Sequence, residues 1–265
     1  AKICIAYFDR EEDMWSADYW NKWHASVDSH VLALPKGPND HIEVGAPPVK
    51  TKHGWLVMYS FIKNYLAPPA VFGVNVALLN LKNPFNIEAK ISEPILVPET
   101  EYERQGEVAN IIFPSGAFIK GKTLYLYYGA ADTTCCLATL KVDDLMNVLL
   151  QPANRMQLFK KFANNPIIQP DRGHAWEAKA TFNAAAILLG SDVHLLYRAM
   201  SDDNTSVFGY ARSKDGFLID YKSAKPIYVP QESFETKSVP GGNSGCEDPR
   251  ITKIDGRYYL VYVAF

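Results

Sequence analysis

Asp248 is the residue whose type and surroundings most directly suggest chemistry. It precedes Pro249 and Arg250 at the start of an apolar segment, where comparable segments of the chain carry small or apolar residues. A buried carboxyl group that keeps its proton can donate it to an acetal oxygen, as cleavage of an acetal requires. The structural alternative is that Asp248 accepts backbone hydrogen bonds before Pro249 and pairs with Arg250. The residue types alone leave both interpretations open.

Asn183 and Arg198 lie at the start and the end of one predicted hairpin. The five N–H donors of an arginine suit a carboxylate, a phosphate or the hydroxyl groups of a sugar. The alternative for Arg198 is a structural ion pair with Glu177 or Glu247. We therefore expect this hairpin to contribute either a ligand site or an internal ion pair.

Asp132 follows a predicted strand that ends in Tyr127 and Tyr128. It could bind a polar ligand, or it could cap the turn before Thr133. Because side chains alternate between the faces of a strand, we expect one tyrosine in the core and the other facing a central channel.

These residues belong to a segment that recurs four times. Each copy has an apolar strand, a turn with Gly or Asp-Gly, and a second strand ending in Tyr; the copies run from Gly45 to Tyr59, Ser115 to Tyr127, Ala184 to Tyr197 and Asp248 to Tyr262. The closing tyrosines are roughly 65–70 residues apart, and repeats of this kind indicate a modular all-β architecture.

Each complete copy continues into two further strands. The third strands are expected at 72–81, 135–140 and 207–212, and the fourth strands are bounded by prolines at 94–98, 166–170 and 226–230. Proline suits an edge strand, and four strands per repeat is typical of a β-propeller blade. We predict a single all-β domain over residues 1–265, a β-propeller with four countable blades. Strands at 3–8 and 31–35 are expected to complete the last blade by pairing with the C-terminal hairpin.

Several fragments together resemble glycoside hydrolase family 130, the β-mannoside phosphorylases and mannosidases. They are Gly45-Ala46-Pro47-Pro48, Tyr127-Tyr128-Gly129-Ala130-Ala131-Asp132, Phe182-Asn183-Ala184-Ala185, Leu196-Tyr197-Arg198-Ala199 and Glu247-Asp248-Pro249-Arg250. The resemblance implies a five-bladed propeller and an oligosaccharide substrate. It also implies that Asp248 is the general acid, that Asn183, Arg198, Asp132, Tyr128 and Glu177 bind substrate, and that Arg198 binds phosphate.

The order of the fragments departs from the family. Residues 1–150 resemble the family's C-terminal part and residues 151–265 its N-terminal part, with a junction near Gln151 to Phe159. The chain therefore resembles a circular permutation, or an excerpt that straddles two tandem copies, and one blade's worth of sequence is expected to be missing.

The resemblance implies cleavage of β-mannosidic linkages by inverting phosphorolysis, which releases mannose 1-phosphate. Phosphate is then a co-substrate, and no organic cofactor is expected. Hydrolysis would instead need a second carboxylate as base, roughly 6.5–9.5 Å from the acid; Glu43, Glu107 and Glu177 are the candidates. A non-catalytic carbohydrate-binding propeller is the remaining alternative.

Composition narrows the other classes of partner. The formal net charge is -2 and charged residues make up 21% of the chain, which leaves no basic excess for nucleic acid or an anionic membrane. The four cysteines show neither zinc spacing nor a disulfide framework, so we expect reduced thiols. His, Cys and carboxylate residues show no cluster at the usual ligand spacing, so no metal site is expected. The expected location is cytoplasmic.

Overall fold

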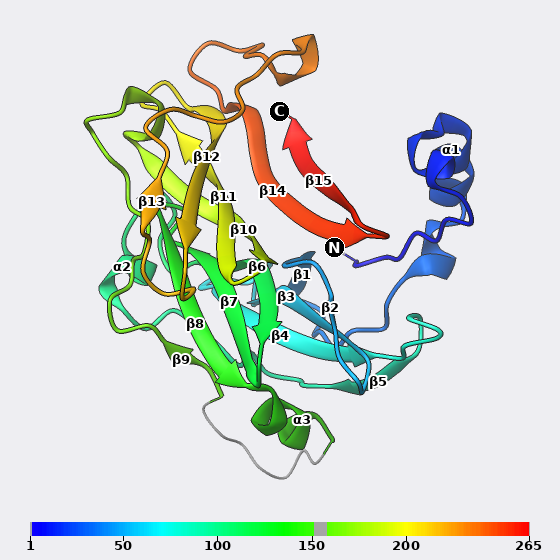
Figure 1. Cartoon of the computed structure of the whole chain (residues 1–265). Helices are drawn as coiled ribbons and strands as arrows, with labels where there is room; N and C mark the ends of the chain where they lie inside the picture. The colour runs from blue at the N-terminus through cyan, green and yellow to red at the C-terminus, as the bar shows by residue number, and fades with distance from the viewer. Residues whose placement is uncertain (1, 151–157, 265) are drawn as a thin grey trace.

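The computed structural model describes residues 2–150 and 158–264, and sheets that radiate from a common centre dominate it (Figure 1). The first blade contains β1 (His41–Val44), β2 (Val49–Lys50), β3 (Trp55–Lys63), β4 (Val71–Leu79) and β5 (Ile87–Lys90). The second contains β6 (Ile112–Lys120), β7 (Thr123–Ala130), β8 (Thr134–Lys141) and β9 (Lys160–Lys161). The third contains β10 (Ala180–Leu189), β11 (Asp192–Met200), β12 (Thr205–Ser213) and β13 (Tyr221–Lys222). The hairpin of β14 (Ser244–Ile254) and β15 (Arg257–Ala264) follows.

The proline-bounded segments have the same place in each complete blade. Leu96, Ile168 and Tyr228 each form a single antiparallel bridge with the third strand of their own blade, to Val74, Cys135 and Phe208. The fourth strand is therefore divided into a short strand and a separate bridge. This repetition confirms the prediction of propeller blades.

The core lies between the blades. One apolar cluster joins β3 and β4 to β6, β7 and β8, and a second joins β7 and β8 to β10 and β11. Both faces of the second blade are thus covered, which explains why its strands read as continuous apolar runs.

The predicted composite blade does not form among the described residues. Cys4 bridges Val31, while Ile3 and Leu32 are buried against the outer face of the first blade, in a cluster that contains Tyr59. These apolar side chains pack on β3, and among residues 2–150 and 158–264 the one strand that pairs with β15 is β14. The expectation that the N-terminal strand would close the ring is wrong.

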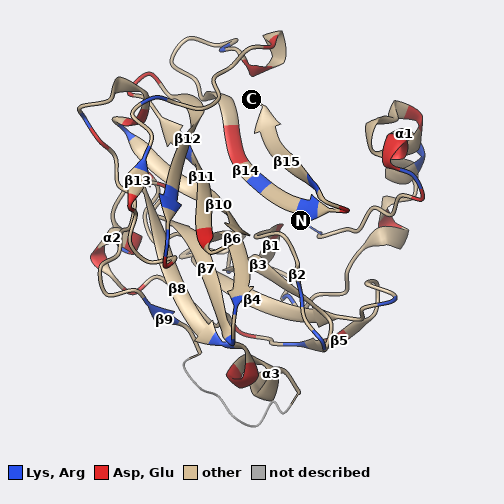
Figure 2. Ribbon diagram, viewed as in Figure 1, with Lys and Arg blue, Asp and Glu red and all other residues tan. Residues whose placement is uncertain are grey.

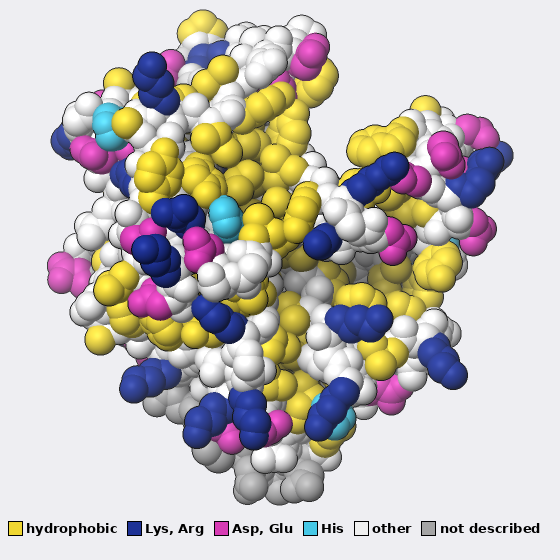
Figure 3. Space-filling view, viewed as in Figure 1, with side chains coloured by type: hydrophobic (Ala, Val, Ile, Leu, Met, Phe, Trp, Pro, Cys, Tyr) yellow, Lys and Arg dark blue, Asp and Glu magenta, His cyan; other side chains and the backbone are white. Residues whose placement is uncertain are grey.

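Three short helices separate the two N-terminal segments: η1 (Glu11–Trp15), α1 (Ala17–Ala25) and η2 (Val27–His30). An ion pair between Arg257 Nη1 and Glu11 Oε2, 3.0 Å, links this region to the tip of the β14–β15 hairpin. Hydrophobic side chains line the hollow beside that hairpin (Figure 3). None of the helices within 2–150 and 158–264, including α2 (Glu101–Arg104) and α3 (Val142–Leu150), is long and apolar enough to span a bilayer.

Candidate active site

The innermost strands β6, β10 and β14 each carry a register shift. The register of β10 shifts between Phe182 and Ala185, and that of β14 shifts between Glu247 and Arg250. Asn183 and Asp248 occupy these bulges with φ of 51° and 50°. Bulges redirect side chains, and left-handed non-glycine residues concentrate at functional sites.

The bulge also corrects the expected position of Asp248. We expected it at the head of a strand, but β14 already begins at Ser244. Asp248 therefore lies at a bulge within β14 and not at its start, and acidic and basic residues follow one another along that strand (Figure 2).

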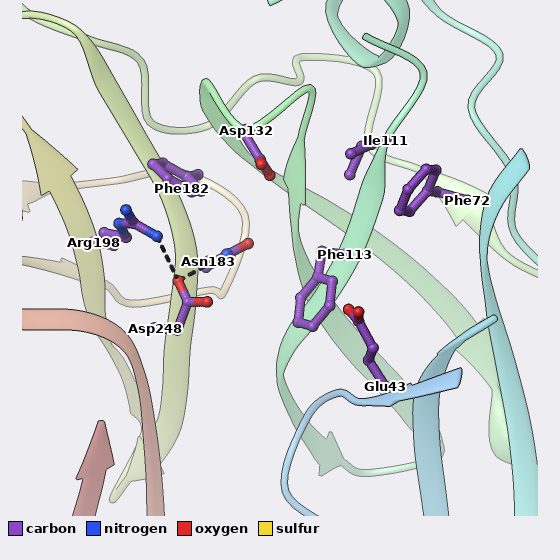
Figure 4. A pocket seen from close by; sticks show the side chains of 9 residues that line it. All are labelled: Glu43, Phe72, Ile111, Phe113, Asp132, Phe182, Asn183, Arg198 and Asp248. Carbon is purple, nitrogen blue, oxygen red and sulfur yellow. Dashed lines mark hydrogen bonds and ion pairs between the residues drawn. The ribbon is translucent and has the colours of Figure 1, made fainter. Parts of the chain in front are cut away.

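A cavity of about 270 Å³ opens where the blades converge (Figure 4). Its lining contains four of the predicted site residues, Asp132, Asn183, Arg198 and Asp248, together with Glu43, Phe72, Ile111, Phe113 and Phe182. The fold thus brings together side chains from the first, second and third blades and from the β14–β15 hairpin. Their roles toward a ligand stay predictions.

The two carboxylate oxygens of Asp248 have different surroundings. Asn183 Nδ2 donates to Oδ1 at 2.9 Å, and Arg198 Nη1 lies 3.5 Å from the same atom. The other oxygen points toward the middle of the cavity (Figure 4). A proton on Asp248 would therefore sit on the oxygen that faces the cavity, because Oδ1 already accepts from two donors.

The predicted alternative of an Asp248–Arg250 pair is not what the contacts of Arg250 show. Its Nε donates to the carbonyl oxygen of Gly45 at 2.9 Å, and its Nη1 donates to that of Pro249 at 2.8 Å. Arg250 therefore ties β14 to the first blade, and burial lowers its pKa.

Arg198 forms the structural ion pair that the sequence left open, and it also borders the cavity. Its Nη2 forms a 2.5 Å ion pair with Glu247, its Nε donates to Ser206 at 3.0 Å, and its guanidinium lies 4.7 Å from the ring centroid of Phe182. The structural ion pair exists, with Glu247 rather than Glu177. The same guanidinium also lines the cavity.

Asp132 lies in the turn between β7 and β8, with φ of 49°. Burial, followed by the negative charge of Asp248, raises the pKa of Asp132 to about 6. The hydroxyl of Thr133 donates to the carbonyl of Ala131 at 2.9 Å, so this turn has a polar contact that does not use Asp132. The carboxyl group of Asp132 belongs to the cavity instead.

Tyr128 and Glu177, predicted to bind substrate, lie elsewhere. Both are fully buried between blades; Tyr128 donates to Glu103 Oε1 at 2.9 Å, and Glu177 Oε2 accepts from Tyr197 at 2.9 Å. Tyr127 is equally buried and donates to the carbonyl of Gly216. The expectation that one tyrosine faces a channel is therefore wrong, because each face of β7 packs against a different neighbouring blade.

Sequence reasoning missed the apolar wall formed by Phe72, Ile111 and Phe113. Phe113 precedes Pro114, where β6 has its own register shift. The equivalence of this bulge to those in β10 and β14 could have indicated that Phe113 lies at the cavity. Glu43, one of the candidate bases, does line the cavity, whereas Glu107 lines an adjoining one and pairs with Lys179 at 2.9 Å.

One group of the described residues has the spacing of metal ligands. Potential ligand atoms of Asp171, His174 and Glu177 lie within 4.8 Å of one another. The ammonium group of Lys222 is 2.9 Å from Glu177 Oε1 and already supplies a positive charge there. We assign no metal to this cluster.

Comparison with known proteins agrees with the propeller and with the resemblance of the motifs. Residues 23–151 and 158–265 match the family described as beta-1,4-mannooligosaccharide phosphorylase. The chain belongs to glycoside hydrolase family 130. The break between the two matched segments falls within the predicted junction, of which residues 151–157 lie outside the described residues. The permuted order stays a prediction.

Two curated relatives in this family come from Thermoanaerobacter sp. (strain X514). A 1,2-beta-oligomannan phosphorylase is 34% identical over 142 residues, 51% of this chain and 45% of that protein. A beta-1,2-mannobiose phosphorylase is 40% identical over 121 residues, 40% of this chain and 36% of that protein. The chain spans less than half the length of these family 130 relatives.

Solved structures support the fold alone. A glycoside hydrolase gives a TM-score of 0.52 at 14% identity, covering 82% of this chain and 64% of that chain. Fructan 1-exohydrolase IIa from Cichorium intybus in complex with 1-kestose gives 0.51 at 14% identity, covering 82% and 36%. At this identity the likeness of the family 130 chain to them concerns architecture, not activity.

Proposed function

We propose that this chain carries the catalytic pocket of an enzyme that cleaves β-mannosidic linkages by inverting phosphorolysis and releases mannose 1-phosphate. The observation that carries the proposal is the asymmetry of Asp248, whose Oδ1 is held by Asn183 and Arg198 while its other oxygen faces the cavity. The phosphorylases among the family relatives support the reaction class.

In the proposed step, Asp248 transfers its proton to the glycosidic oxygen while the bond from that oxygen to the anomeric carbon breaks. A phosphate oxygen bonds to the anomeric carbon from the opposite face, so the β-linkage gives an α-linked phosphate. The released sugar keeps the proton, and Asp248 regains one from solvent. Asp132 and Asn183 are proposed to accept from and donate to sugar hydroxyls, and Arg198 to attract the phosphate.

Hydrolysis is a second candidate because of the charges in the cavity. Glu43, Asp132 and Asp248 are three carboxyl groups, and Arg198 is the single Lys or Arg among the described residues of the lining. Phosphate would meet this acidic lining with one guanidinium to attract it, whereas water needs only a carboxylate base such as Glu43.

Product analysis separates these possibilities. The protein is incubated with β-1,2- and β-1,4-linked manno-oligosaccharides, with and without inorganic phosphate, and products are followed by ³¹P and ¹H NMR. Phosphorolysis gives α-mannose 1-phosphate only with phosphate, and hydrolysis gives mannose in both arms. Absence of both products, with saturable sugar binding by calorimetry, would overturn the enzymatic proposal and identify a binding propeller.

A further inference from the structure

Glu247 and Asp248 are neighbours in sequence and share one guanidinium. The register shift in β14 begins at Glu247, and both carboxylates reach Arg198. Arg198 Nη2 lies 2.5 Å from Glu247 Oε1, whereas Nη1 lies 3.5 Å from Asp248 Oδ1. The short, strong interaction therefore belongs to Glu247, and Asp248 receives only a long one.

Ser206 fixes this unequal division. Its hydroxyl accepts from Arg198 Nε at 3.0 Å and lies 3.3 Å from Glu247 Oε1. The side chains of Arg198 and Glu247 are only 9% and 13% exposed, so solvent screens their interaction weakly.

We propose that Glu247 is a positioning residue that keeps Asp248 able to hold a proton, by engaging Arg198 in the closer ion pair. The inference rests on the proposed role of Asp248 as general acid. A guanidinium bonded closely to Asp248 would stabilise the carboxylate and remove the proton that the reaction needs. Glu247 opposes this in two ways, because it draws the guanidinium to itself and adds a negative charge beside Asp248.

Other charged groups act on Asp248 from the surrounding elements. Asp132 faces it from the turn after β7, Glu43 from β1, and Arg250 from β14 itself. The first two favour the protonated form and Arg250 favours the carboxylate. None of them contacts Arg198 as closely as Glu247. Replacing Glu247 should therefore change how the guanidinium of Arg198 is shared between Glu247 and Asp248.

The test is Glu247→Gln, which preserves shape but removes the charge. The pH dependence of kcat/KM and the ¹³C titration of the Asp248 carboxyl, assigned by its loss in Asp248→Asn, are compared with wild type. We expect the basic limb and the carboxyl titration to move to lower pH by about 1 unit, and turnover above that limb to fall about tenfold.

Two controls make the result specific. Glu107→Gln also removes a negative charge, beside the adjoining cavity, but Glu107 pairs with Lys179 and not with Arg198. The titration of the Asp248 carboxyl should therefore move by a few tenths of a pH unit at most in this variant. Glu247→Asp keeps the negative charge and is the second variant if Glu247→Gln fails to fold. Its Asp248 carboxyl should titrate near the wild-type pH. Unchanged titration in Glu247→Gln, or an equal shift in Glu107→Gln, would overturn the inference. A wild type without turnover would contradict the proposed function, while the carboxyl titration would still decide the role of Glu247.

Discussion

Glu103 is a fully buried carboxylate and Asp132 a partly buried one, and their surroundings differ in kind. Glu103 Oε2 accepts from the backbone N–H groups of Glu99 and Thr100 and from Lys161 Nζ, and Oε1 accepts from Tyr128. Burial alone would raise the pKa of Glu103, but the backbone hydrogen bonds and Lys161 outweigh it and hold the pKa below its usual value. For Asp132, burial prevails and the pKa rises to about 6.

The surroundings of Glu103 recur between successive blades. Glu177 accepts a hydrogen bond from Tyr197 and pairs with Lys222, both in the third blade. Glu103 has the same two kinds of partner, Tyr128 and Lys161, in the second blade. Glu235 similarly accepts from Tyr262 of β15. We call Glu103, Glu177 and Glu235 the inter-blade carboxylates. In these three residues the carboxylate oxygens are hydrogen-bonded, and the side chain stabilises the fold. A carboxyl group with an oxygen that faces a cavity is instead available to a ligand.

The largest effect should come from Asp248→Asn. An amide accepts the same hydrogen bonds from Asn183 and Arg198 but cannot supply a proton, so turnover should fall about 10²- to 10⁴-fold. Steady-state kinetics measures the loss, and denaturant unfolding should show a change in stability within about 1 kcal/mol. Activity near that of wild type would place Asp248 with the structural carboxylates and break the comparison.

Glu103→Ala should instead affect the fold. It leaves Tyr128 and two backbone N–H groups without their acceptor. Lys161 loses the closer of its two carboxylates and keeps Glu99 at 3.0 Å. Together these losses should lower the free energy of unfolding by about 3–5 kcal/mol. Glu101, exposed on the same helix α2, supplies the control, since Glu101→Ala should change stability by less than about 0.5 kcal/mol. Equal effects of the two variants would show that the inter-blade hydrogen bonds contribute little.

The pH dependence of Glu103 has a defined sign. Because the folded state depresses its pKa below the ordinary 4.5, its contribution to stability is present above that value and is lost as pH falls through the folded pKa. Glu103→Gln should flatten this part of the acid unfolding curve.

The charge of Asp132 should affect stability in the opposite direction to that of Glu103. The pKa of Asp132 is 3.8 without perturbation and about 6 in the fold, so folding disfavours the charged form, and wild-type stability falls as pH rises between these values. Asp132→Asn should be more stable than wild type by about 1–3 kcal/mol at pH 8, with no advantage below pH about 3.8. Thermal unfolding at both pH values, with Asp202→Asn at an exposed position as control, measures this. A destabilised variant at pH 8 would mean that Asp132 is a structural carboxylate.

Much of the fold followed from the sequence because blades repeat. The Gly-bounded hairpins and the proline-bounded segments predicted which strands pair, and equivalent positions in the repeats indicated Asn183 and Asp248. The repeat could not tell which of two covered faces a residue enters, so Tyr128 was misplaced. It also could not predict that Ile3 would pack on β3 rather than beside β15, because both surfaces are apolar.

The smallest expected effect is that of Tyr197→Phe. It removes one donor from Glu177, which keeps His174 Nδ1 at 2.7 Å and Lys222 Nζ at 2.9 Å, so the free energy of unfolding should fall by only about 1 kcal/mol. Tyr221→Phe, at a half-exposed position, should change nothing measurable. Because Glu177 lies between blades and outside the cavity lining, KM for the oligosaccharide should equal that of wild type in both variants. A raised KM in Tyr197→Phe alone would return Glu177 to the substrate site and erase the distinction between the two kinds of buried carboxylate.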